Sequence, residues 1–410
     1  MSGDDRRRLA PTRRNYVKYG GALLGGGLLA GCAGNSDSES TQTTPTETET
    51  TTDATGTETE PPYTAEIAPV GRVSLEEPPT NVFTHFPWFA DMASALGRGD
   101  TINNVWWSGT TEALNYFTDG FNDFEISWRD RTGEYGFTKE QLYELDSDLH
   151  LVDPAWVTTQ DNWSRSDISE VSNNIGPWFG NYYSGSHGTP PETWADEYEY
   201  NTLWELFDGA ASLYGERSRY EALAAVRDNL LERIENGLPP ESERPTAAYL
   251  SIETDLSAIY ALRLNSLGYW NSHTRPLGAV DAFGGQEFSG PFKRIDMEAL
   301  LEVDPDVILA LWTVTETVDF EQMEKNLRDD PVGSEVSAVQ NDRVCVQGTR
   351  WQGPLMNLFQ LEMTAKQLYP EQFGEWPRYQ NGDTYPAFSS DEQLFDHQRV
   401  ADILRGEFDA

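Results

Sequence analysis

Aromatic side chains and arginines gather in the short segments that follow predicted β-strands, and such side chains can hold a bulky, partly apolar ligand. Aromatic rings give a large, stiff contact area at low entropic cost, and a guanidinium pairs bidentately with carboxylate or catecholate oxygens. In the first half of the chain these residues are His85, Phe86, Trp88, Trp106, Trp107, Trp156, Trp178, Phe179, Tyr182 and Tyr183. In the second half they are Tyr260, Tyr269, Trp270, His273, Arg275, Trp312, Arg350 and Trp351.

Ligands of open α/β sheets bind beyond the carboxyl ends of the strands, so we expect these segments to line one cleft. Packing in the core or at the rim is the alternative for each aromatic residue, and solvation or an ion pair is the alternative for each arginine. The candidates for ligand contact are His85, Trp88, Trp107, Trp156, Trp178, Tyr182, Trp270, Arg275, Trp312, Arg350 and Trp351.

Metal-binding and catalytic motifs are missing from the sequence. The five histidines, at positions 85, 150, 187, 273 and 397, show no metal-ligand spacing. The sequence contains no Gly-x-Ser-x-Gly, His-Glu-x-x-His, Cys-x-x-Cys or Walker loop. We therefore expect no enzymatic activity, no cofactor and no directly coordinated metal, so that any metal arrives already chelated.

The elements that position the candidates follow an α/β pattern. Short β-type runs at 70–75, 82–84, 102–107 and 149–152 alternate with helical runs at 89–96 and 138–145. Residues 204–237 are strongly helical, and a strand at 246–252 begins a second α/β unit. Further helices are predicted at 355–369, with Pro354 at its first position, and at 394–404. Cys345 is expected to be a small buried side chain in a strand.

The two units show a weak internal echo. Residues 139–149 read KEQLYELDSDL and residues 297–307 read MEALLEVDPDV. In both, a glutamate opens a two-turn helix that ends at an Asp-x-Asp turn into an apolar strand. The echo indicates a duplicated architecture.

The N-terminus has the pattern of an export signal. Residues 12–18 read TRRNYVK, a twin-arginine motif with Arg13 and Arg14, and the apolar stretch after it is too short to span a membrane. Residues 29–32 read LAGC and are similar to a lipobox, which predicts lipid attachment at Cys32. Beyond it, the segment up to residue 62 is rich in Thr, Glu and Ser and is expected to form a disordered tether.

The charge of the chain excludes one class of function and suggests an environment. The 29 Lys and Arg against 68 Asp and Glu give a formal net charge of −39, which excludes a general nucleic-acid binder. Lysine occurs at only five positions. Such a surface is typical of a halophile, because at molar salt the Debye length is roughly 3 Å and self-repulsion is screened.

Several motifs occur in a familiar order: EALLEVDPDVIL at 298–309, its counterpart from Glu140, GERSRY at 215–220 and AVQNDRV at 338–344. Together they resemble the substrate-binding lipoproteins of ABC importers for ferric siderophores, haem and vitamin B12, haloarchaeal in type, over roughly residues 70–370. The resemblance implies an α/β fold of two lobes joined by a single long rigid helix at 216–236, with the ligand cleft between them. In that family one acidic residue of each lobe docks onto the permease, and the matching positions are Glu140 and Glu298. The alternative is an ordinary first-turn glutamate favoured by the helix dipole.

The implied function is an extracellular, lipid-anchored protein that captures a ferric siderophore in the cleft and delivers it to a membrane permease. Its partners would be that ABC permease and its ATPase, and the protein would be a monomer at the outer face of the cytoplasmic membrane. Cobalamin or haem are alternative ligands within the class. A surface adhesion or structural lipoprotein, and less favourably an extracellular hydrolase, are alternatives from other classes.

The implied domain organisation has six parts. They are a signal peptide at 1–31, a tether at 32–62, an N-terminal α/β lobe at 63–208, an inter-lobe helical region at 209–240, a C-terminal α/β lobe at 241–375 and a tail with a short helix at 376–410.

Overall fold

The computed structural model describes residues 63–408, except for 107–108, 121–125, 127, 129–131, 134 and 289. The predicted twin-arginine motif with Arg13 and Arg14, the lipidation site Cys32, the tether and Trp107 therefore lie outside the described residues. Among the described residues, no helix is both long enough and apolar enough to cross a membrane.

The N-terminal lobe is built on a parallel four-stranded sheet with the order β5-β4-β3-β6. Its strands are β3 (Val82–Thr84), β4 (Ile102–Trp106), β5 (Thr132–Gly133) and β6 (Leu149–Leu151). Every residue of β3 and β6 is buried, as expected of a parallel sheet covered on both faces. Its helices are α1 (Pro87–Ala95), α2 (Gly109–Thr118), α3 (Lys139–Leu145), α4 (Pro154–Val157) and α5 (Arg165–Asn174).

A two-stranded antiparallel hairpin precedes this sheet. It consists of β1 (Tyr63–Ile67) and β2 (Gly71–Leu75), and β1 packs on helix α6 (Leu203–Tyr214). The sequence predicted β2 but not β1, α2 or α5.

The C-terminal lobe is built on a six-stranded mixed sheet. Its main order is β10-β8-β7-β11-β12, with β9 beside β7. Strands β7, β9, β11 and β12 are parallel, whereas β8 and β10 are antiparallel to their neighbours. The bounds are β7 (Thr246–Ile252), β8 (Ile259–Leu262), β9 (Val280–Asp281), β10 (Phe292–Ile295), β11 (Val307–Ala310), β12 (Val344–Val346), α8 (Met297–Val303), α9 (Phe320–Asp329) and α10 (Ser337–Gln340). Cys345 lies in β12 and is half-buried.

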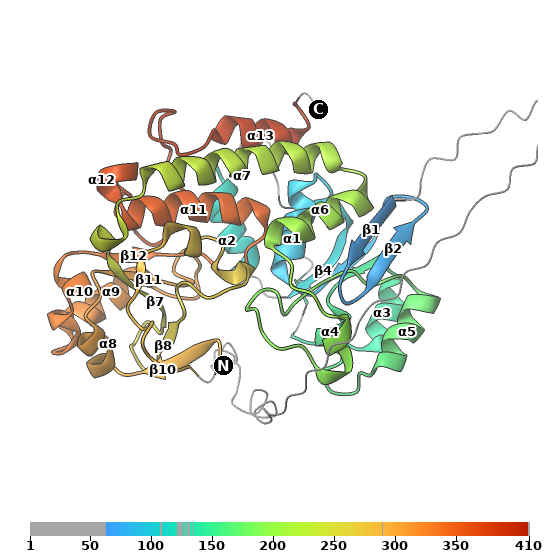
Figure 1. Ribbon diagram of the computed structural model, residues 1–410, viewed down its shortest axis with the longest axis horizontal. Helices are drawn as coiled ribbons and strands as arrows, with labels where there is room; N and C mark the ends of the chain where they lie inside the picture. The colour runs from blue at the N-terminus through green and yellow to red at the C-terminus, as the bar shows by residue number, and fades with distance from the viewer. Residues whose placement is uncertain are drawn as a thin grey trace, which may run out of the picture. The chain divides into compact units, whose positions relative to one another are not determined.

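One long helix, α7 (Arg217–Gly237), connects the two lobes along the chain, close to the predicted range. It follows α6 after Gly215, whose positive φ of 71° ends that helix in the left-handed region. Figure 1 shows α7 running beside α11 (Pro354–Leu368) and α13 (His397–Arg405). The short α12 (Pro370–Phe373) follows α11 directly. The mixed α/β architecture, with one main sheet in each lobe, agrees with the predicted fold class.

Helix α11 is buried on every side, although it carries polar residues. Pro354 occupies its first turn, as predicted, and all of its residues are buried. The Glu362 carboxylate accepts hydrogen bonds from the Tyr385 hydroxyl, at 2.6 Å, and from the backbone of Leu394, and it pairs with His397 Nε2 at 2.6 Å. These partners satisfy a carboxylate that would be costly to bury alone.

The internal echo extends to side-chain contacts. Helices α3 and α8 both end at an aspartate in the left-handed region, Asp146 with φ 45° and Asp304 with φ 37°. Two residues later, Asp148 accepts hydrogen bonds from the backbone and hydroxyl of Thr80 at 2.8 and 3.0 Å. Asp306 accepts the same pair from Thr246 at 2.8 and 2.7 Å. The second aspartate of each motif thus connects the end of its helix to a neighbouring segment, which is the one at Thr80 for Asp148 and the start of β7 for Asp306.

Candidate ligand-binding site

A continuous set of aromatic residues, which we call the aromatic cluster, lies beyond the carboxyl ends of strands from both sheets. His85 and Phe86 follow β3, Trp106 ends β4 and Trp156 lies in α4 after β6. The loops after β11 and β12 contribute from the C-terminal lobe. We define the aromatic cluster as His85, Phe86, Trp106, Trp156, Tyr182, Trp270, Trp312 and Trp351.

The two lobes meet through this cluster. The ring of Trp351 lies 5.0 Å from that of Trp106 in the N-terminal lobe and 5.1 Å from that of Trp312 in its own lobe. On the other side, Tyr182 and Trp270 lie 5.5 Å apart with their rings nearly perpendicular. Ring pairs at these separations favour each other beyond the area they bury.

Backbone hydrogen bonds join the lobes beside Trp270. The N–H of Trp270 donates to Gly185 O at 2.9 Å, and the N–H of Tyr269 donates to Ser184 O at 3.2 Å. A Cβ at Gly185 would lie 2.3 Å from Trp270 Nε1, so only glycine permits this approach. Gly268, with φ 100°, turns the chain into the same contact.

His85 has the most unusual environment in the cluster. Its imidazole is fully buried and stacks between Trp106, at 5.6 Å and 8°, and Trp156, at 5.0 Å and 23°. Neither ring nitrogen has a hydrogen-bond partner among the described residues. Burial lowers the pKa of His85 to about 3, so the ring is neutral at physiological pH. A buried polar group without a partner is costly in a folded protein.

The C-terminal lobe contributes a strained tryptophan and an arginine. Trp312 has φ 71°, in a region that bulky residues rarely adopt. Backbone strain of this kind persists where the surrounding structure enforces it, often at binding sites. The guanidinium carbon of Arg350 lies 4.6 Å from the centre of the Trp270 ring, in a cation–π contact.

Besides Arg350, three candidates lie outside the aromatic cluster. Trp88 is fully buried behind it, stacked on Phe86 at 4.4 Å. Trp178 is buried against His150 at 4.7 Å, and its Nε1 donates to Ile168 O at 3.1 Å. The structure therefore places Trp178 in the core of the N-terminal lobe, separate from the other aromatic candidates.

Arg275 is the third candidate outside the cluster, and its hydrogen bonds go to the backbone. Its Nη1 donates to Ser266 O and Gly268 O, both at 3.1 Å, and burial lowers its pKa. It therefore holds the loop that carries Trp270. The remaining described candidates, His85, Trp156, Tyr182, Trp270, Trp312 and Trp351, belong to the aromatic cluster, with Arg350 against it.

The candidate set omitted one buried acid, Asp153, which positions two of the aromatic residues. Its carboxylate accepts hydrogen bonds from the N–H of Tyr182 and the hydroxyl of Tyr198, both at 2.7 Å, and caps α4 through the N–H of Ala155 at 2.7 Å. Burial raises the pKa of Asp153 to about 6 against these hydrogen bonds. An aspartate before Pro154 at the end of a strand was the available signal for this cap.

The family model of the periplasmic binding proteins matches residues 112–349, which is more than half of the chain. The chain belongs to the periplasmic binding protein family. No curated protein matches the sequence. The two-lobed α/β architecture is that of a substrate-binding protein of this family.

Solved structures similar to this periplasmic binding protein share its fold at low sequence identity. An iron-uptake ABC transporter substrate-binding protein from Streptococcus pneumoniae is 16% identical with a TM-score of 0.51, covering 75% of this chain and 97% of that one. The haem-binding protein HmuT is also 16% identical with a TM-score of 0.51, covering 77% and 93%. A Fe³⁺-hydroxamate transport protein from Saccharomonospora viridis is 16% identical with a TM-score of 0.50, covering 76% and 99%.

The two glutamates predicted to dock onto a permease occupy equivalent positions in this periplasmic binding protein. Glu140 and Glu298 both lie in the first turn of their helices, α3 and α8, and both are exposed. Hydrogen bonds from its own backbone N–H and from the Thr138 hydroxyl lower the pKa of Glu140. Each lobe therefore presents one carboxylate at the start of its repeated helix.

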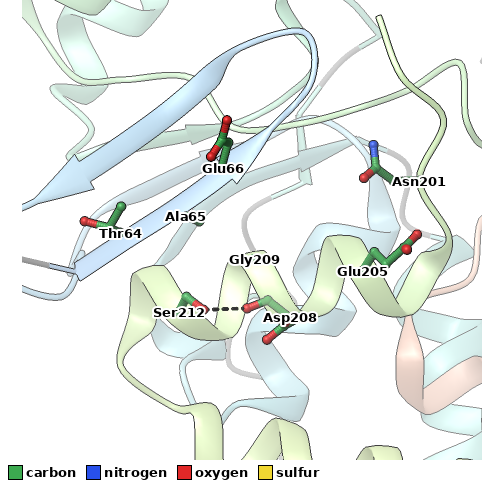
Figure 2. Close-up of a pocket in the computed structure, with 8 residues that line it drawn as sticks. All are labelled: Thr64, Ala65, Glu66, Asn201, Glu205, Asp208, Gly209 and Ser212. Carbon is green, nitrogen blue, oxygen red and sulfur yellow. Dashed lines mark hydrogen bonds between the residues drawn. The ribbon is translucent and has the colours of Figure 1, made fainter. Parts of the chain in front are cut away.

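A surface pocket between β1 and α6 has a different chemistry from the cluster. Figure 2 shows its lining, which is Thr64, Ala65, Glu66, Asn201, Glu205, Asp208, Gly209 and Ser212. This lining has three carboxylates and no aromatic or basic side chain, and Asp208 is paired with Arg217 at 2.6 Å. Among the described residues, no group of three or more His, Cys, Asp or Glu is arranged to hold a metal ion. The aromatic cluster is therefore the better candidate for a bulky, partly apolar ligand.

Proposed function

We propose that this chain is the substrate-binding protein of an ABC importer and that it captures a chelated iron compound, a ferric siderophore, between its two lobes. It then delivers the chelate to a membrane permease driven by an ATPase. The observation that carries the proposal is the aromatic cluster, in which side chains from both lobes meet, as Trp106 at the end of β4 and Trp351 after β12 do. Membership of the periplasmic binding protein family supports the same class.

Ligand entry at the cluster requires the lobes to move apart, because Trp106 and Trp351 contact each other directly. This movement breaks the two backbone hydrogen bonds beside Trp270. Helix α7 connects the lobes as one continuous element, so the change is a small rotation of the lobes and not a wide hinge opening. In the bound state, His85 supplies an uncharged hydrogen bond to the chelate.

A fluorescence titration tests this function. The mature chain from residue 32, in molar KCl, is titrated with ferric hydroxamate and catecholate siderophores, haemin and cobalamin while tryptophan emission is followed. We expect saturable quenching by one of these ligands. We also expect Trp351→Ala to weaken that binding at least tenfold, because it removes the indole that lies between Trp106 and Trp312 and offers its faces to a ligand held between the lobes.

The matched control is Trp376→Ala, which removes a half-buried tryptophan whose ring packs on Tyr385 and Phe388, away from the cluster. This variant should bind as the wild type does. The absence of any response from protein that circular dichroism shows to be folded would refute the proposal. Equal weakening in both variants would refute the placement at the cluster.

We also propose that the protein is exported by the twin-arginine route and anchored through a lipid on Cys32, at the outer face of the membrane. Residues 12–18 and the lipobox at 29–32 support this. Arg13→Lys combined with Arg14→Lys should retain the protein inside the cell. Cys32→Ser should release exported protein into the medium. Protein that remains membrane-bound after Cys32→Ser would argue against the anchor.

Docking of the permease is assigned to Glu140 and Glu298. Charge reversal by Glu140→Arg with Glu298→Arg should abolish ligand uptake by cells and leave the affinity of the purified protein unchanged. Glu144→Arg with Glu302→Arg, later in the same helices, is the control and should leave uptake intact. Normal uptake by the first double variant would contradict the assignment.

A further inference from the structure

Few of the described candidate residues are charged. Of the ten described candidates, Arg350 and Arg275 are the only cations. Arg275 is engaged with the carbonyl oxygens of Ser266 and Gly268, which leaves Arg350 as the cation in contact with a ring of the cluster.

A buried carboxylate offsets this positive charge. Asp153 contacts the segments that carry two rings of the cluster. Its carboxylate accepts a hydrogen bond from the N–H of Tyr182 and caps the short helix that carries Trp156. With a pKa of about 6 it is mostly ionised at pH 7. Its negative charge offsets the positive charge of Arg350.

Two uncharged side chains of the cluster have buried polar atoms without a partner among the described residues. These atoms are both ring nitrogens of His85 and the indole Nε1 of Trp270. A neutral imidazole and an indole N–H suit the carbonyl, amide and ether oxygens of an uncharged ligand. They do not compensate the desolvation of several full negative charges.

Ring faces also select against anions. The face of an aromatic ring carries negative potential, which attracts cations and repels anions. A trianionic chelate would exchange water for indole and imidazole faces with one guanidinium as compensation, whereas a neutral chelate would lose little. Salt does not remove this penalty, because buried charges are screened much less than exposed ones.

Building on the function proposed above, we propose that the ligand is a metal chelate of zero or small positive net charge, represented by the tris-hydroxamate class, and that trianionic tris-catecholate chelates are rejected. The cluster thus selects its ligand by net charge as well as by apolar contact.

The test compares two chelates of the same metal ion. Gallium(III) replaces iron(III), since it has the same charge and does not quench fluorescence. The mature chain in 2 M KCl is titrated by calorimetry with a neutral gallium tris-hydroxamate and with a trianionic gallium tris-catecholate. We expect the tris-hydroxamate to bind at least about 100-fold more tightly. Catecholate affinity within tenfold of the hydroxamate, or tighter, overturns the inference and leaves the proposed function standing. Binding of neither chelate overturns both.

Two variants of Arg350 provide an independent readout. For an uncharged ligand, Arg350→Gln and Arg350→Lys should have affinities for the tris-hydroxamate within threefold of each other. Rescue by lysine of a loss above tenfold in the glutamine variant would mean that the arginine pairs with an anionic group of the ligand, which overturns the inference. Arg378→Gln, an exposed arginine of the C-terminal tail that pairs with Glu324, is the control for a general change in net charge.

Discussion

At the scale of single residues, burying the His85 side chain costs free energy that burying an aromatic hydrocarbon side chain would not. Its two ring nitrogens are buried between tryptophans without hydrogen-bond partners among the described residues. An unsatisfied buried polar group costs about 1–3 kcal/mol. We expect His85→Phe to raise the free energy of unfolding at pH 7 by about 1–2 kcal/mol and to lower ligand affinity at least tenfold. Urea unfolding and calorimetry in molar KCl measure the two effects, and a destabilised variant with full affinity would contradict this view.

The same residue makes stability sensitive to acid. Because the pKa of His85 is about 3 in the folded protein and 6.5 in the unfolded chain, only the unfolded chain takes up the proton between these values. The titration of His85 therefore does not affect the free energy of unfolding above pH 6.5, and it lowers that free energy progressively as the pH falls toward 3. At pH 5 the loss is about 2 kcal/mol. The stability advantage of His85→Phe over the wild type should thus grow by about 2 kcal/mol between pH 7 and pH 5, and a constant difference would show that the ring is protonated when folded.

At the scale of elements, Asp91 joins a helix of each lobe. From α1 its carboxylate accepts the N–H of Leu355 at 3.0 Å and of Met356 at 3.1 Å, which caps α11. A Cβ at Gly353 would lie 2.4 Å from Asp91 Cβ, so the two helices approach closely. Asp91→Asn keeps one accepting oxygen and turns an amide N–H₂ toward the other donor. We expect it to lower the free energy of unfolding by about 1–3 kcal/mol. Unchanged urea unfolding would mean that the cap contributes nothing.

The C-terminal tail is fastened to both lobes. Tyr385 donates its N–H to Tyr116 O in α2 at 3.1 Å, and Asn381 Nδ2 donates to Asp319 at the start of α9 at 2.6 Å. The buried Glu362 of α11 also holds the tail, through Tyr385 and His397. Glu362→Ala leaves the buried partners of the carboxylate without an acceptor, so we expect a loss of about 3–5 kcal/mol and earlier proteolytic release of the tail.

The control for this prediction is Glu371→Ala, an exposed glutamate of α12 that should change stability by less than about 0.5 kcal/mol. If both variants unfold at the same urea concentration, the tail is not held by Glu362.

Elements with strong local signals were predictable from the sequence. Strands β3 and β7, helix α11 from its Pro354 and the repeated Asp-x-Asp turns all depend on neighbouring residues, and the structure has them where expected. The aromatic residues that follow the strands could also be picked out, because the ends of strands can be recognised in the sequence. The position of Trp178 was not, since whether an aromatic residue after a strand faces the core or the partner lobe depends on packing with distant residues. For the same reason, the contacts of Asp91 with α11 and the packing of the C-terminal tail on α11 could not be predicted from the sequence.

At the scale of the whole molecule, the net charge of −39 opposes the compact state. At 0.1 M salt the Debye length is about 10 Å, so neighbouring carboxylates repel one another, whereas at 1 M it is about 3 Å. We expect the free energy of unfolding to fall steeply when KCl is lowered from 3 M to 0.2 M. Sucrose at 0.2 M KCl separates screening from strengthened apolar burial, because it favours burial without screening charge.

A pair of adjacent exposed acids tests the electrostatic origin directly. Glu76 and Glu77 follow β2 at the surface. Glu76→Gln with Glu77→Gln removes two like charges, so it should stabilise the protein at 0.2 M KCl and have little effect at 3 M, where the repulsion is already screened. The urea midpoint of the variant and the wild type at both salt concentrations measures this difference. Equal effects at both concentrations would assign the salt requirement to apolar burial, because repulsion between exposed carboxylates must weaken as the Debye length shortens.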